Sequence, residues 1–204
     1  AALFSLGVVL NVETGWDALM YHLRLPSFYV YRHKFYDVWH SYYSAYPSQV
    51  EMLYTAAMMI NGDFLARFLN ASFGLATLAA AAALARELGN PGRWAGVLLA
   101  SSPMFLMLAT RAYVDLGLAL FVTLSLLNFL RWHRTGSVPV LLAGGLLAGW
   151  GMGSKYTGVF VIASVLAGMG SRVNGAPGRR SLARWGLAAA APLAPWLLKN
   201  WLMK

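Results

Sequence analysis

The sequence predicts an all-α integral membrane protein: a polytopic helical bundle of about seven spans, the first truncated, with a long extracytoplasmic first loop that contains juxtamembrane helices. Of the 204 residues, 59% are hydrophobic and only 11% are charged, whereas a soluble domain averages about 25% charged residues. Long runs with few or no charges recur along the chain. This apolar content excludes disorder, and the scattered Lys and Arg residues argue against a nucleic-acid partner. We expect membrane lipid to cover most of the surface.

The apolar runs set the expected spans, because a membrane helix needs roughly 20 residues. We interpret 1–12 as the end of a truncated first span, and we therefore expect the chain to be the N-terminal part of a longer protein and to be inactive alone. A single transmembrane domain (1–204) continues with an extracytoplasmic loop (13–63) and six further spans (64–204). Those spans are the runs 64–85, 94–110, 116–130, 135–154, 156–171 and 185–198.

The charges of the loops give the orientation, because cytoplasmic loops carry an excess of Lys and Arg. Six of the seven acids fall on the side of the loop 13–63, which also receives the turns near 111–115 and 151–155 and the end 199–204. We expect that side to be extracytoplasmic. The opposite loops, interpreted as cytoplasmic, hold one acid, Glu87, and eight arginines: Arg86, Arg93, Arg131, Arg134, Arg172, Arg179, Arg180 and Arg184.

The loop 13–63 combines aromatic residues with a short apolar stretch. The stretch 48–60, with Glu51 near its start, suits a helix lying in the membrane interface better than a span. An interfacial belt is the simplest role for most of the aromatic rings, although a few could stack on a sugar. Eleven of the 28 aromatic residues of the chain lie here: Trp16, Tyr21, Phe28, Tyr29, Tyr31, Phe35, Tyr36, Trp39, Tyr42, Tyr43 and Tyr46.

Acids near the ends of the expected helices are the first candidates for chemistry. In the segment 16–26, Asp17, Tyr21 and Arg24 would share one helical face, although Asp17 could simply cap or ion-pair at the start of a juxtamembrane helix. Asp115 emerges on the same side and could also cap its own helix. Glu13 lies nearer the membrane end of the first span, and we interpret it as structural.

A lysine and a set of glycines mark the outer turn near residue 155. Lys155 lies between two hydrophobic segments, where it could snorkel or bind a ligand. Gly145, Gly149 and Gly153 recur every fourth residue, which predicts a groove for close helix packing. The histidines of the outer loop match no standard metal-ligand spacing, and the chain has no cysteine. The sequence supports no metal or other cofactor, although a divalent metal stays open.

Five segments occur in a fixed order along essentially the whole chain, and together they carry a resemblance to a known family. They are Trp16-Asp17-Ala18-Leu19-Met20-Tyr21-His22-Leu23, the stretch from Tyr46-Pro47 to Asn61-Gly62-Asp63-Phe64-Leu65-Ala66-Arg67, Ala112-Tyr113-Val114-Asp115, the turn from Gly149 to Lys155-Tyr156-Thr157-Gly158, and Pro195-Trp196-Leu197-Leu198-Lys199-Asn200. In this order they resemble the GT-C superfamily of membrane glycosyltransferases, specifically the bacterial relatives of protein O-mannosyltransferase and aminoarabinose transferase. Many members place two acids close together in loop one, whereas here Glu13 and Asp17 are four residues apart.

The resemblance implies a glycosyltransferase of the bacterial plasma membrane that works at the extracytoplasmic face. Its donor would be a polyprenyl-phosphate sugar, and its acceptor a hydroxyl group. Asp17 would be the general base for that hydroxyl, and Asp115 would orient the acceptor or position a cation. Positive charge would stabilise the phosphate leaving group, supplied first by Lys155 and then by Arg111 and Arg67. We also expect three residues of the matched motifs to contact substrate: Tyr21, His22 and Tyr156.

Two other functions remain open on sequence grounds. A transporter or flippase of lipid-linked sugars is the main alternative, and Pro103, Pro192 and Pro195 could break its helices. Every expected span, however, lacks a charge in its middle third, which favours chemistry at the surface over transport. A non-enzymatic membrane scaffold would leave the polar motif of loop one without a role.

Overall fold

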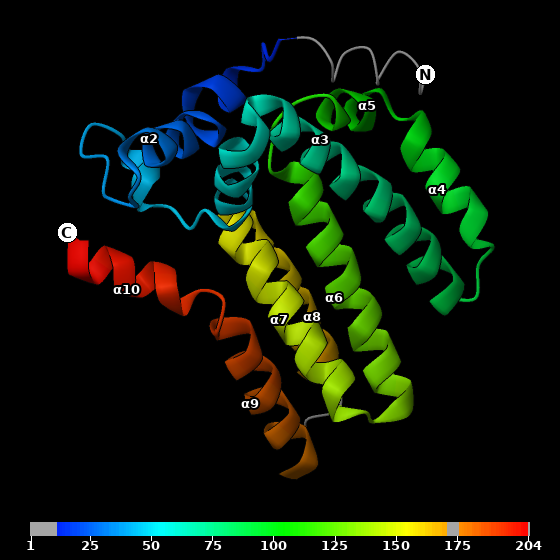
Figure 1. Cartoon of the computed structure of the whole chain (residues 1–204). Helices are drawn as coiled ribbons and strands as arrows, with labels where there is room; N and C mark the ends of the chain where they lie inside the picture. The colour runs from blue at the N-terminus through cyan, green and yellow to red at the C-terminus, as the bar shows by residue number, and fades with distance from the viewer. Residues whose placement is uncertain (1–11, 171–175, 204) are drawn as a thin grey trace.

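The computed structural model describes residues 12–170 and 176–203, and the regular structure within these ranges is helical throughout (Figure 1). This confirms the predicted all-α class. The predicted end of the first span lies outside the described residues, apart from Val12. The elements are η1 (Ala18–His22), α2 (Arg24–Arg32), η2 (Tyr42–Ala45), α3 (Gln49–Glu87), α4 (Gly92–Ser101), α5 (Pro103–Ala109), α6 (Asp115–Thr135), α7 (Val138–Ser154), η3 (Tyr156–Gly158), α8 (Val159–Gly170), α9 (Ala176–Ala190) and α10 (Ala194–Met203).

Two of the described helices, α3 and α6, are long and apolar enough to cross a membrane. The bent pair α4–α5 would make a third span if it crosses as one unit. Helices α7 and α8 are apolar but shorter than a full span. The chain therefore has two to three candidate spans by length and composition, and the number of seven stays a prediction.

Helix α3 is broken between an N-terminal part, 49–60, and a longer part, 63–87. Asn61 and Gly62 have non-helical dihedral angles, and Gly62 has a φ of 59°, which glycine adopts without the steric cost of a side chain. The break separates the short apolar stretch from the span that follows it, as the sequence predicts. The position of 49–60 in a membrane interface stays a prediction.

Two expected spans are not single helices. The run 94–110 is divided into α4 and α5, which are bent by 76°, and the run 185–198 is interrupted between α9 and α10. The breaks occur at two of the prolines that the sequence marks as possible helix breakers. Pro103 pushes the preceding Ser102 into an extended conformation, and Pro192 falls inside the second break, where its missing N–H cannot continue a helix.

Glycines let α7 pack closely on its neighbours. A Cβ atom at Gly145 or Gly149 would collide with backbone carbonyl oxygens of α9, and one at Gly153 would collide with the Gln49 side chain. The predicted glycine groove is therefore confirmed, and it faces α9 and the start of α3. Gln49 Nε2 in turn donates a hydrogen bond of 2.7 Å to the Pro192 carbonyl oxygen. These contacts fix the end of α7, where Lys155 follows.

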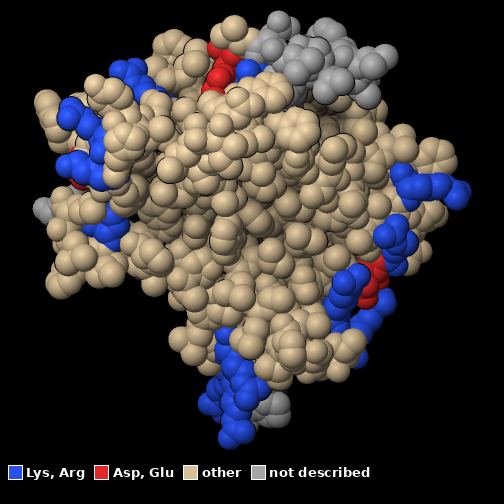
Figure 2. All heavy atoms as spheres, viewed as in Figure 1, with Lys and Arg blue, Asp and Glu red and all other residues tan. Residues whose placement is uncertain are grey.

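Charged side chains gather in separate groups near the rim of the molecule in Figure 2, with a wide uncharged surface between them. One end of the bundle brings together the end of α3 and the end of α6, where Glu87 pairs with Arg134 at 3.0 Å and with Arg131 at 3.6 Å. The opposite end carries η1, α2 and the turn after α7 (Figure 1). Each ion pair among the described residues joins groups that the sequence assigns to one side, which supports the predicted division of the loops.

Candidate functional site

The acidic motif of loop one forms an unusually wide helical turn. In η1 the Leu23 backbone N–H donates to the Ala18 carbonyl oxygen at 2.8 Å, five residues back. Such π-helical turns are rare and are often found at functional sites. The wide turn also changes which side chains share a face. Tyr21 lines one cavity and Arg24 another, and the two cavities share Leu25 and Tyr43; the common face stays a prediction.

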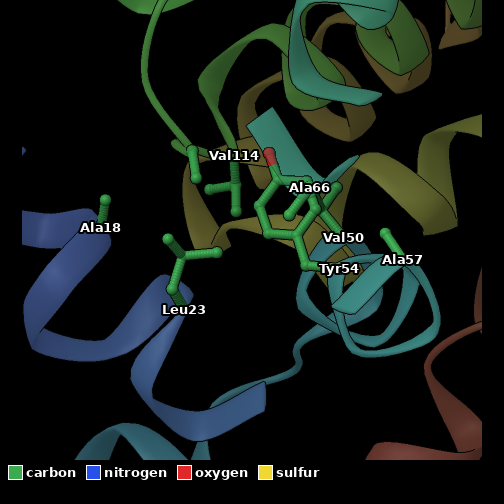
Figure 3. Packing of buried hydrophobic residues seen from close by; sticks show 8 residues of the cluster. Ala18, Leu23, Val50, Tyr54, Ala57, Ala66 and Val114 are labelled. Atoms are coloured by element: carbon green, nitrogen blue, oxygen red, sulfur yellow. The ribbon is translucent and has the colours of Figure 1, made fainter. Parts of the chain in front are cut away.

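Figure 3 shows the core that holds this turn in place. Ala18 and Leu23 belong to one buried cluster with Val50 and Tyr54 of α3, and with Val114, which precedes α6. The Tyr54 hydroxyl donates a hydrogen bond of 2.6 Å to the Tyr113 carbonyl oxygen. The core thus joins three segments that are distant in the sequence, and the candidate site lies next to it, with Val114 in both.

A cavity of about 150 Å³ opens beside this core, and we call it the Lys155 cavity. Four residues predicted to bind substrate line it together, although up to 135 positions separate them: Tyr21, His22, Lys155 and Tyr156. Its wall is largely aromatic. The rings of Tyr21 and Tyr43 stack in parallel at 4.1 Å, and Tyr46 meets Tyr156 edge to face at 5.3 Å.

An ion pair holds the cation of this cavity. Lys155 Nζ donates to Asp115 Oδ1 at 2.8 Å, and both side chains are partly exposed. Asp115 lies in the first turn of α6, and Lys155 directly follows α7. An ammonium group has three N–H donors, so two remain for a ligand after Asp115 has taken one. This contact is the one expected if Asp115 positions Lys155.

A second pair is buried in the cavity lining. His22 Nδ1 donates to Glu51 Oε1 at 2.8 Å, because a carboxylate can only accept, and both residues are at most 5% exposed. The other oxygen, Glu51 Oε2, has no hydrogen-bond partner among the described residues. Glu51 was not among the predicted site residues. Its signal in the sequence is that it is the lone acid of the apolar stretch 48–60.

Asp17 immediately precedes η1 and is half-buried. Its side chain makes no cap hydrogen bond, so the alternative of a helix-capping role is wrong. It does not line the Lys155 cavity, but its charge acts on the neighbouring tyrosine. Burial, and after it the negative charge of Asp17, raise the pKa of Tyr21 above its ordinary value. Asp17 therefore lies close enough to Tyr21, a residue of the cavity lining, for its charge to act on the phenol.

Two phenols of the cavity wall, Tyr21 and Tyr43, stay neutral over the physiological range. A hydrogen bond with Tyr42, and to a lesser degree burial, raise the pKa of Tyr43 to about 12. A neutral phenol both donates and accepts hydrogen bonds. The wall can therefore hold polar ligands without adding charge.

The two other predicted phosphate-binding cations do not reach this cavity. Arg111 lies 3.9 Å from Glu13, whose carboxylate also accepts from the backbone N–H groups of Gly15 and Ala112. Glu13 thus has the structural role expected of it. Arg67 is buried and pairs with Asp63 at 3.4 Å. Both arginines are held by acids of the outer segment, so neither lines the Lys155 cavity.

Comparison with known proteins gives one match. A family model described as dolichyl-phosphate-mannose-protein mannosyltransferase matches residues 47–199. No curated protein and no solved structure matches the chain. The matched range holds Glu51, Asp115 and Lys155, and it begins after Asp17 and the rest of η1. Among the described residues no three His, Asp or Glu side chains form a group with the arrangement of a metal site.

Proposed function

The chain belongs to the dolichyl-phosphate-mannose-protein mannosyltransferase family, membrane glycosyltransferases of the GT-C type, and from this premise we propose that it transfers a sugar from a polyprenyl-phosphate donor to an acceptor hydroxyl at the outer membrane face. The family implies an integral membrane protein that uses a lipid-linked sugar. The observation that carries the finer proposal is the Lys155–Asp115 pair at an aromatic cavity. In this proposal the whole chain contributes one transmembrane domain, with 13–63 as its outer segment.

Lys155 binds the phosphate of the donor. The leaving group of this reaction is a phosphate, which departs with the electron pair of the bond to the anomeric carbon and therefore gains negative charge. A positioned cation stabilises that charge more in the transition state than in the ground state. Lys155 has two N–H donors beyond the one given to Asp115. Asp115 keeps the ammonium group oriented as the charge develops.

Asp17 accepts the proton of the attacking hydroxyl. As the acceptor oxygen forms its bond to the anomeric carbon, its proton passes to the Asp17 carboxylate, and the polyprenyl phosphate leaves. Asp17 makes no cap hydrogen bond, so its lone pairs are available to a substrate. General bases of this kind contribute about 10²- to 10⁴-fold to rates. Asp17 does not line the Lys155 cavity. This fits an acceptor that approaches from outside the cavity in which the donor is bound.

The direct test is a transfer assay on the full-length protein in membranes, with radiolabelled polyprenyl-phosphate sugars as donors. Transfer from at least one donor, with release of polyprenyl phosphate, is the expected result. Absence of transfer from every such donor would overturn the proposal. Transport of the intact lipid-linked sugar across vesicles, without transfer, would favour the flippase alternative instead.

The outer-face assignment has its own test, because this chain contains no Cys. Single substitutions Lys34→Cys, in the outer segment, and Asn90→Cys, between α3 and α4, place exposed thiols at opposite ends of the bundle. Any Cys elsewhere in the full-length protein is first replaced. A membrane-impermeant thiol reagent should label Lys34→Cys in intact cells and label Asn90→Cys only after lysis. The reverse pattern would place the site on the cytoplasmic side.

A further inference from the structure

Glu51 has one carboxylate oxygen that finds no partner within 12–170 and 176–203. Only 5% of the residue is exposed, and Oε2 accepts no hydrogen bond while Oε1 accepts one from His22. A buried polar atom without a partner costs roughly 1–3 kcal/mol, and more when the group is charged. Native proteins keep few such atoms, and each needs an explanation. Because Glu51 lines the Lys155 cavity, a ligand in that cavity can supply the missing donor.

The surroundings of Glu51 select the kind of donor. The Lys155 ammonium group lines the same cavity and is already held by Asp115, so the donor to Glu51 Oε2 can come from an uncharged ligand. In the described part of the chain, the His22 side chain hydrogen-bonds this carboxylate at Oε1 and fixes its orientation. A neutral hydroxyl group fits the remaining oxygen best. A hydrogen bond to a charged acceptor is about twice as strong as one between neutral groups.

The rest of the cavity fits a small polyhydroxylated ring. Its volume of about 150 Å³ suits one ring rather than a polyprenyl chain. The stacked Tyr21 and Tyr43 form a flat wall, and Tyr156 adds a hydroxyl group to the rim. Apolar and aromatic walls with a few placed polar groups are what ligand cavities generally use to fix orientation.

We propose that Glu51 Oε2 accepts a hydrogen bond from a hydroxyl group of the donor sugar, which lies in the Lys155 cavity against the tyrosine wall. This inference rests on the proposed function, since Lys155 then holds the phosphate of the same donor. His22 is a positioning residue, because it orients the carboxylate through its other oxygen. Glu51 thereby recognises the sugar, whereas Lys155 binds the phosphate that every donor of this class shares.

The test separates these two roles with two lipids. Binding to the full-length protein is measured in lipid nanodiscs for polyprenyl phosphate without a sugar and for polyprenyl-phosphate mannose. Glu51→Gln should weaken binding of the sugar-bearing lipid by about tenfold or more and change binding of the sugar-free lipid less than about twofold. Lys155→Gln should weaken both lipids. Asp63→Asn is the matched control, because this acid lies away from the cavity and should change neither.

Two results would overturn the inference: equal weakening of both lipids by Glu51→Gln, or no weakening of either. If Glu51→Gln does not fold, Glu51→Asp keeps the charge but withdraws it by one methylene, and it should still lose most of the advantage of the sugar-bearing lipid. Retention of that full advantage in a folded Glu51→Asp variant would also overturn it. Failure of the unsubstituted protein to bind either lipid would instead overturn the proposed function.

Discussion

The two parts of the site handle charge differently. In the part matched by the family model, the acids are paired: Asp115 binds Lys155 and Glu51 binds His22. In the loop-one part, Asp17 makes no cap hydrogen bond and faces neutral phenols instead. Paired charges position ligands and one another, whereas a carboxylate with available lone pairs can take up a proton. The difference suggests that the helices bind the donor while loop one supplies the base.

Removing the charge of Asp17 tests the loop-one half of this comparison and should have the largest effect. Asp17→Asn keeps the shape of the side chain but cannot accept a proton, so the transfer rate should fall by about 10²- to 10⁴-fold. Binding of the lipid donor should be almost unchanged. Asp63→Asn, another acid of the outer segment, is the control. Near-normal turnover of Asp17→Asn would remove Asp17 from the mechanism.

Removing the charge of Lys155 tests the helical half. Lys155→Gln should lower the transfer rate by about 10²- to 10³-fold, as expected when one donor to a developing negative charge is lost, and should also weaken the binding of polyprenyl phosphate. Lys34→Gln is the matched control, because this lysine lies outside the cavity. Donor binding that is insensitive to Lys155→Gln would contradict the division between the two halves.

The order of the sequence motifs made much of the site predictable. Lys155, Tyr156, Tyr21 and His22 were expected to act together, and they line one cavity with Asp115 held against Lys155. The glycine spacing of α7 also predicted its close packing. The glycine pattern is local, because it depends on residue types at short spacing within one helix. The cavity residues were grouped instead through the order of motifs along the chain.

What the sequence missed has more than one cause. Arg67 pairs with Asp63 at the helical spacing i, i+4, which the sequence does show. Arg111 lies near Glu13, and that long-range pairing has no signal in a single sequence. The π-helical turn of η1 has none either, because its wide hydrogen bonds need no special residues. Hydropathy alone does not show the breaks at Pro103 and Pro192, but the prolines themselves mark them as possible.

Loosening the support of α7 should show how far the helical half depends on packing. Gly149→Ala adds a methyl group against the α9 backbone, which should cost about 1–3 kcal/mol of stability and disturb Lys155 at the end of α7. Thermal unfolding in detergent and donor binding measure the two effects. Gly186→Ala on α9, where nothing lies within 4 Å of the added atom, is the control. Equal stability of both variants would mean that the groove is not tightly packed.

Removing the charge of Asp115 should have a smaller effect on transfer than removing that of Lys155. Asp115→Asn removes one partly exposed ion pair, worth up to about 1 kcal/mol, so transfer should fall only about fivefold. In the double variant with Lys155→Gln, Asp115→Asn should add little, because the group it positions is already gone. A full additional fivefold loss in the double variant would show that Asp115 acts directly on substrate rather than through Lys155.

The smallest expected effect is on the pH dependence of stability, and it comes from Tyr21, which lines the cavity and senses the charge of Asp17. Burial and the charge of Asp17 raise the folded-state pKa of Tyr21 above its ordinary value of 10.0, so the folded protein holds this proton more tightly than the unfolded chain. The corresponding stability is complete below pH 10 and declines as the pH rises above it. Thermal unfolding measured between pH 8 and pH 11 should show that decline, and Tyr21→Phe should make it shallower. Tyr31→Phe, at an exposed tyrosine of α2, should leave the slope unchanged. An equal slope of stability against pH in all three proteins would mean that Tyr21 is not buried beside Asp17. The proposed base would then lie further from the donor cavity than the comparison of the two halves requires.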